Sequence, residues 1–131
     1  MSGNGEGFWD DADVVYTYAR AQALADGVLV DVSEVAREAG FRFPVAVTRA
    51  VWEAIEDIPP SKRGAQDVQG RLWDVVYMAA LAARGSRPGA TVVYYRLIMH
   101  QGRNTYKDLK MVIGPGDSGE PVITIMEPEE D

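Results

Sequence analysis

The sequence predicts an α+β domain in which about four helices, one of them central and buried, cover one face of a three-stranded antiparallel meander. Three observations lead to this class. Helical periodicity dominates the first two thirds of the chain, alternating periodicity dominates the last third, and no linker or internal repeat divides the 131 residues. Helices followed by a run of strands are typical of α+β proteins. One domain of this length buries a core without disulfides.

Composition divides the chain into an acidic segment over 1–12, a single domain over 13–126 and an acidic tail over 127–131. We expect the first segment to be disordered, because it is rich in Gly and poor in core-forming residues. It nevertheless contains Phe8 and Trp9, close to three aspartates. These aromatic side chains either pack on the domain as a strap or dock on a partner protein.

The segment GRLWDVVYMAALAARG, residues 70–85, predicts the central helix. One helical face carries Leu72 and Val75, and a second carries Trp73 and Tyr77. Because both faces are apolar, we expect this helix to be buried between other elements, with Tyr77 in the core. The segment is shorter than the roughly 20 apolar residues that cross a bilayer, so we expect no membrane span.

Three shorter helices are predicted before the central one, each bounded by a capping hydroxyl, a glycine or a proline. Their expected ranges are 18–26, 34–39 and 44–58. Residues 28–32 are β-branched and either form a strand or cross the surface in extended form. Asp67 can cap the approach to the central helix.

Apolar residues alternate along the last third of the chain, which predicts three strands. The expected strands are 90–99, 106–113 and 122–126, joined by a hairpin loop over 100–105 and a Gly/Pro loop over 114–121. In the first strand the outward residues Val92, Tyr94 and Ile98 are apolar as well. An apolar outer face needs a cover, so a third hypothesis is a homo-oligomer in which these residues pack on a second copy.

The formal net charge of −7 is concentrated at the two ends of the chain. Four of the 20 acidic residues lie in 1–13 and four in 127–131, whereas all 13 basic residues lie between these segments. The nearly neutral body argues against direct nucleic-acid binding. The chain has no cysteine and one histidine, so the sequence predicts no metal site and no cofactor. Without a signal peptide, we expect a cytoplasmic protein.

The loop GPGDSGEP contains a Gly-Asp-Ser-Gly segment that resembles the nucleophile segment of trypsin-like proteases. The context does not fit, because that fold is a larger all-β double barrel and the single histidine, His100, ends a predicted strand. We therefore expect a strand connection in which Asp117 and Ser118 bond their own backbone.

Asp74 is the only charge between Arg71 and Arg84. If it is buried, it needs a partner or has a raised pKa, which can mark a site. The simpler interpretation is an ion pair with Arg71, one turn back near the helix N-terminus.

Several segments, in order, resemble a family of short bacterial proteins of unknown function, DUF6573. They include YTYARAQA from Tyr16, DGVLVDVS from Asp26, GRLWDV from Gly70 and GPGDSGEPVITIM from Gly114. The resemblance implies an origin in bacteria, often on phages, plasmids or integrated elements. Accessory proteins of such elements are often inhibitors of host defence systems. The resemblance assigns no activity to any residue.

The sequence therefore predicts a non-enzymatic accessory factor that binds a protein, with inhibition of a host defence system as a role that the resemblance suggests. The alternative is a small enzyme or ligand-binding protein with a pocket between the central helix and the sheet. The lack of catalytic and nucleic-acid motifs favours the first. The candidate interaction or pocket residues are Phe8, Trp9, Asp74, Tyr77, Arg103, Asp117 and Ser118.

Overall fold

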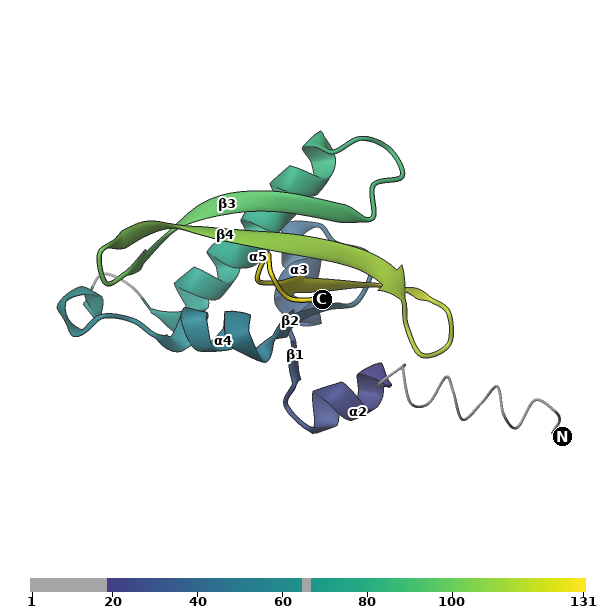
Figure 1. Cartoon of the computed structure of the whole chain (residues 1–131), viewed down its shortest axis with the longest axis horizontal. Helices are drawn as coiled ribbons and strands as arrows, with labels where there is room; N and C mark the ends of the chain where they lie inside the picture. The colour runs from purple at the N-terminus through teal and green to yellow at the C-terminus, as the bar shows by residue number, and fades with distance from the viewer. Residues whose placement is uncertain (1–18, 65–66) are drawn as a thin grey trace, which may run out of the picture.

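The computed structural model describes residues 19–64 and 67–131 (Figure 1). Phe8 and Trp9 lie outside this part of the chain. The described helices are α2 (Arg20–Ala25), α3 (Ser33–Ala39), α4 (Arg49–Glu56), the short 3-10 helix η1 (Pro60–Lys62) and α5 (Val68–Gly85). The described strands are β1 (Leu29–Asp31), β2 (Val45–Thr48), β3 (Val92–Gln101), β4 (Asn104–Pro115) and β5 (Pro121–Met126).

The five strands form one mixed sheet in the order β1-β2-β5-β4-β3. The last three strands form the expected antiparallel meander. In addition, β2 pairs with β5 in parallel and with β1 in antiparallel orientation. The α+β class is therefore confirmed, whereas the prediction of a three-stranded antiparallel sheet was wrong.

The missed strand β2 lies where the sequence predicts the start of a helix. Val45, Ala46 and Val47 have no exposed surface, as is typical of a central strand that is covered on both faces. A run of so few apolar residues does not distinguish the period of a strand from that of a helix. Helix α4 begins later, at Arg49, after the Thr48 hydroxyl caps it by accepting a hydrogen bond from the Val51 amide at 3.4 Å.

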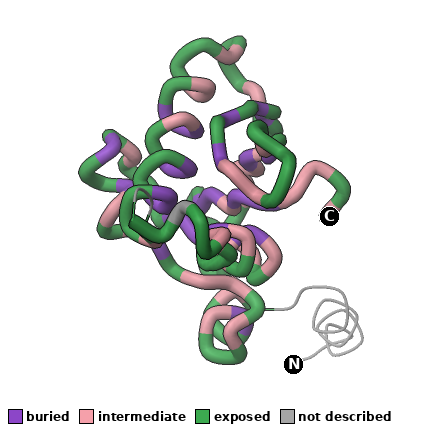
Figure 2. Tube along the Cα trace, turned by 90° about the vertical axis from the view of Figure 1, so that its left-hand side faces the viewer, coloured by how far each residue is buried: buried purple, intermediate pink, exposed green. Residues whose placement is uncertain are grey.

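Helices α3, α4 and α5 pack on one face of the sheet. Buried and exposed residues alternate along β3, so only one face of this strand meets the helices. Figure 1 shows α3 and α5 behind β3 and β4, and in Figure 2 the buried stretches lie toward the centre of the molecule. The buried residues of β3 are Val93, Tyr95, Leu97 and Met99.

Helix α5 is covered on one side only. Its buried side includes Val75 and Val76, which have no exposed surface. On its other apolar face Trp73, Tyr77 and Leu81 are 36, 39 and 38% exposed. The rings of Trp73 and Tyr77 stack on this surface with their centroids 5.4 Å apart. The prediction that both apolar faces of the helix are buried was wrong.

A buried arginine fixes the N-terminal end of α5. Arg71 is 4% exposed, and its Nη1 donates to the carbonyl oxygens of Ala54 at 2.9 Å and Asp57 at 3.1 Å. Its Nη2 donates to the carbonyl oxygen of His100. The last carbonyls of a helix have no partner within it, so Arg71 satisfies the end of α4 while joining it to α5 and β3.

A second buried contact holds the middle of α5. The Tyr95 hydroxyl on β3 donates to the carbonyl oxygen of Val75 at 2.9 Å. Burial raises the pKa of Tyr95, so the phenol stays protonated and acts as the donor. Arg71 and Tyr95 together set the position of α5 on β3.

We expect Arg71→Met to lower the free energy of unfolding by about 3 kcal/mol, because it leaves buried carbonyl groups without donors. Urea unfolding followed by tryptophan fluorescence measures this change. The matched control is Arg87→Met, which removes an exposed arginine and should change stability by less than about 0.5 kcal/mol. Equal effects of the two substitutions would show that the carbonyl contacts of Arg71 contribute nothing.

Candidate protein-binding site

Exposed apolar side chains lie on two surfaces, the outer face of α5 and the face of the β3–β4 hairpin that the helices leave open. Among the described residues, nine large apolar side chains are exposed, and seven of them belong to these elements. As predicted, the outward side of β3 is apolar. Such patches mark interaction surfaces more often than isolated exposed residues do. The seven residues are Trp73, Tyr77, Leu81, Val92, Tyr94, Ile98 and Tyr106.

Strand β3 lies at the end of the sheet, and within the described ranges no strand pairs with its outer edge. The carbonyl of Thr91 accepts a hydrogen bond from the Ile113 amide on the β4 side at 2.8 Å. Backbone groups alternate in direction along an antiparallel strand, so those of Tyr94, Arg96 and Ile98 point to the open edge.

Proteins usually protect a strand edge by keeping it short or by placing Lys, Pro or a bulge on it. Strand β3 has ten residues and contains neither Lys nor Pro. Its register is irregular only between Ile98 and Gln101, at its end. Within residues 19–64 and 67–131 no strand pairs with the edge before this point, and Arg96 is the one charged residue of the strand.

Two hollows adjoin this edge beside α5. The first has a volume of about 340 Å³ and lies between the start of α5 and the end of β3. The second, about 460 Å³, lies between Met78 on α5 and Tyr106 on β4. Asp74 and Ile98 line both hollows, so we treat them as one feature, the edge groove. Its other lining residues include Arg63, Asp67, Arg71, Arg96, Leu97, Met99 and His100.

Asp74 lies where the two hollows meet. Across residues 19–64 and 67–131 its carboxylate has neither a hydrogen bond nor an ion pair. Arg71, the partner that the sequence suggests, donates to backbone carbonyls instead. Burial raises the pKa of Asp74 above its ordinary value. The residue is exposed, so its carboxylate is accessible, and a negative charge without a counter-charge favours a cationic ligand.

Arg96, the one Arg or Lys residue of β3, already has partners. Its Nε and Nη2 donate to the two carboxylate oxygens of Asp108 at 2.7 and 3.2 Å. Its guanidinium also lies 5.5 Å from the centre of the Tyr106 ring. The hydrogen bonds raise the pKa of Arg96 and lower the pKa of Asp108. Arg96 is thus held by β4 and leaves Asp74 without a counter-charge.

The Gly-Asp-Ser-Gly loop has a structural role at a different place. The Asp117 carboxylate accepts hydrogen bonds from the amides of Arg20 at 2.7 Å and Ala21 at 2.9 Å, the first residues of α2. These bonds lower the pKa of Asp117. The Arg20 side chain donates in turn to Ile123 and Thr124 of β5. Asp117 and Arg20 together fasten α2 to the sheet.

In the described part of the chain, the histidine does not lie beside Ser118. Its amide donates to the Glu120 carboxylate at 2.9 Å, and the residue is exposed. His100, the single histidine of the chain, ends β3, whereas this loop adjoins the other end of that strand. A catalytic triad requires the imidazole to bond the serine hydroxyl. The loop therefore resembles the protease segment in sequence but not in structure.

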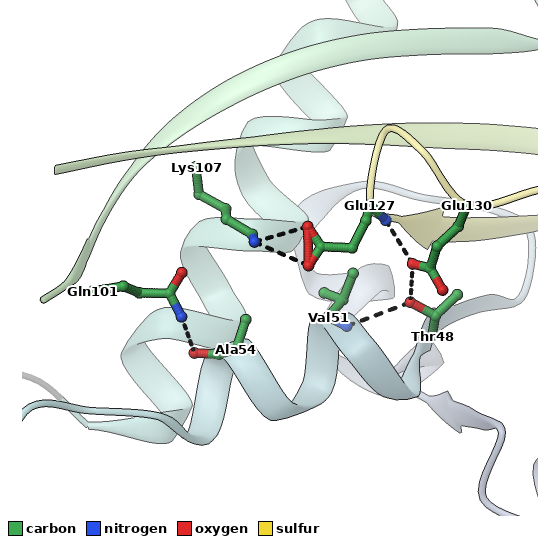
Figure 3. A network of polar contacts seen from close by, with 7 residues as sticks. All are labelled: Thr48, Val51, Ala54, Gln101, Lys107, Glu127 and Glu130. Atoms are coloured by element: carbon green, nitrogen blue, oxygen red, sulfur yellow. Dashed lines mark hydrogen bonds and ion pairs between the residues drawn. The ribbon is translucent and has the colours of Figure 1, made fainter. Parts of the chain in front are cut away.

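The acidic tail is bound to the domain through several contacts (Figure 3). The Glu130 carboxylate accepts hydrogen bonds from the Thr48 hydroxyl at 2.8 Å and the Glu127 amide at 2.7 Å. Glu127 forms an ion pair with Lys107 at 2.7 Å, and the Lys110 ammonium donates to the Glu130 carbonyl. These two glutamates therefore act within the fold.

Of the candidate residues from the sequence, Asp74 lines the edge groove and Tyr77 lies on the exposed face of α5. Arg103 is exposed in the turn between β3 and β4, and Asp117 and Ser118 lie in the structural loop. Sequence reasoning missed Met78 and Tyr106. Tyr106 could have been found, because it pairs across the hairpin with Ile98.

Two further findings bear on the type of site. In the part of the chain that the structure describes, no three His, Cys, Asp or Glu side chains converge where a metal ion could be held. None of the described helices is long and apolar enough to cross a membrane.

Two aspartates should show opposite effects of pH on stability. Folding raises the pKa of Asp74, so stability falls as the pH rises from the ordinary value of 3.8 through the raised value. Asp74→Asn should therefore unfold at a higher temperature than the wild type at pH 7, with a smaller difference at pH 3. Thermal unfolding at a series of pH values measures this.

Asp117→Asn is the matched control, because its expected effect on stability at pH 7 has the opposite sign. Folding lowers the pKa of Asp117. The ionised carboxylate therefore stabilises the fold at neutral pH, and this stabilisation is lost as the pH falls through the lowered value. This variant should be less stable than the wild type at pH 7. Effects of the same sign for both variants at pH 7 would contradict the assigned environments.

Comparison with known proteins gives one match. No curated protein and no solved structure matches the chain. The sequence pattern of DUF6573, a family of unknown function, matches residues 5–131, which is nearly the whole chain. The resemblance seen in the separate segments is thus confirmed over their full extent. The protein belongs to the DUF6573 family of unknown function.

Proposed function

We propose that this protein is a non-enzymatic binding module that engages another protein through the edge groove. The observation that carries the proposal is a ten-residue strand with an open edge beside an apolar hollow and a helix. Addition of an extended segment to such an edge supplies backbone hydrogen bonds, and adjoining pockets select its side chains.

The side chains around the groove support this proposal. Ile98 and Tyr106 are each 59% exposed, and Tyr94 is 65% exposed. Exposing such large apolar groups to water costs free energy that association with a partner recovers. Tyrosine is also a residue type that is enriched at the centres of protein interfaces.

The alternative of a small enzyme calls for a pocket between α5 and the sheet. The residues on that boundary are tightly packed, and Val75, Val76 and Met111 have no exposed surface. The two hollows open at the strand edge instead, and no Ser, Thr, Cys or Lys among the described residues lines either of them. Protein binding therefore fits the site better. Inhibition of a host defence protein by a mobile-element product would be one use of such a module.

Site-specific photo-crosslinking in the cells that make the protein tests the proposal. A photoreactive phenylalanine analogue at Tyr106 places the probe in the groove, and the same analogue at the exposed Glu38 of α3 serves as the control. We expect one protein to be captured from position 106 and not from position 38. Capture should be lost when Ile98→Glu is added, because a charge then replaces an apolar groove residue.

Mass spectrometry of the crosslinked products identifies the partner. Equal capture of the same proteins from both positions, or capture that Ile98→Glu leaves unchanged, would contradict binding through the edge groove.

A further inference from the structure

We infer that the occupant of the edge groove is an extended segment of the partner that adds to β3 as a sixth strand and places a Lys or Arg side chain beside Asp74. The inference rests on the proposed function and specifies the chemistry of the ligand. Three features of the groove carry it: its backbone edge, its two rows of side chains and its unpaired charge.

The backbone edge defines where the added strand lies. The amide and carbonyl groups of Val92, Tyr94, Arg96 and Ile98 point outward. Beyond them, the carbonyl of His100 is occupied by Arg71. The register irregularity after Ile98 coincides with this contact. Pairing therefore ends near Ile98, and the edge accommodates a segment of about seven residues at roughly 3.3 Å per residue.

Helix α5 supplies a floor for one side of the added strand. Asp74 and Met78 of α5 line the hollows beside the Ile98 end of β3, and in Figure 1 the C-terminal half of the helix continues past the strand on the side where the helices pack. Successive side chains of a strand point to opposite faces. One row of the added strand would therefore meet Asp74 and Met78 on α5, and the other would lie beside Tyr94, Ile98 and Tyr106.

The negative charge of Asp74 favours a positively charged side chain on the ligand. Its carboxylate lies in the groove without a partner among the described residues, and burial raises its pKa. A cation within about 4 Å offsets this desolvation, whereas an acidic side chain would be repelled.

A second copy of the chain is a poorer occupant. In a pair of β3 strands, the row that faces α5 would consist of Val93, Tyr95, Leu97 and Met99 of the other copy. None of these residues carries a positive charge. The single Arg of β3 lies in the other row and is already bound by Asp108. Pairing between copies would therefore leave Asp74 buried and without a counter-charge.

A random library of eight-residue peptides, displayed on phage and selected on the full-length protein, tests the inference. We expect the selected peptides to alternate apolar residues and to share one Lys or Arg. Calorimetry with the best synthetic peptide should show binding about fivefold weaker to Asp74→Asn, which removes the charge at nearly constant shape. Glu38→Gln, an exposed acid outside the groove, is the matched control and should bind as the wild type does.

Methylation of the peptide backbone tests the added strand itself. An added strand uses every second amide for pairing with β3, so N-methylation of these amides should abolish binding, whereas methylation of the intervening amides should be tolerated. A charge-reversal pair gives a further check. Asp74→Lys should reject the basic peptide and bind a version in which Glu replaces the basic residue.

Three results would overturn the inference. Selected peptides without a basic residue, or with equal affinity for Asp74→Asn, would remove the role of Asp74. Tolerance of N-methylation at every position would remove the added strand. A dimer in light scattering that Ile98→Glu dissociates would assign the edge to a second copy. In the first two cases, crosslinking of a partner at Tyr106 would still support the proposed function. Failure of the inference can therefore be distinguished from failure of the proposed function.

Discussion

The contacts of the buried Arg71 guanidinium are the interaction on which the rest of this surface depends. One side chain satisfies carbonyl groups at the end of α4 and at the end of β3, and it belongs to α5 itself. Removing a charge from water is costly, but several carbonyl oxygens around a planar guanidinium offset this cost. The contact fixes α5 against the last strand of the sheet and closes one end of the groove beside it. The geometry of the edge groove therefore follows from a structural contact.

Most of the conspicuous acidic groups stabilise the fold. Asp117 caps α2, which also bonds to β5 through Arg20, and the tail glutamates bond to Thr48, Lys107 and Lys110. Each of these carboxylates has amide, hydroxyl or ammonium donors around it. Asp74 has no donor among the described residues, and neither has an exposed acid such as Glu38, but Asp74 lies in the edge groove. Asp74 makes no contact that holds the fold together, and its position beside the strand edge leaves its charge available to a ligand.

The sequence predicted the parts of the fold that depend on local periodicity. Alternation in residues 90–126 gave the antiparallel meander and the apolar outer side of β3. The parallel contact of β2 with β5 depends on residues far apart in the chain, and the four residues of β2 are too few to show a period. The exposed face of α5 was missed for a related reason. Apolar periodicity indicates which residues can be buried, but Trp73 and Tyr77 stay on the surface because no described element covers them.

For the candidate site, the sequence pointed to Asp74 but paired it with Arg71, which donates to carbonyl groups of α4 and β3.

Binding through the edge groove requires that the edge of β3 is open in the free protein. Amide hydrogen exchange, measured by NMR on dilute protein without a partner, tests it most directly. We expect slow exchange for Val93, Tyr95 and Leu97, whose amides bond to β4, and fast exchange for Tyr94, Arg96 and Ile98, whose amides point outward. Slow exchange of both sets would contradict an open edge, because the outward amides would then already be covered.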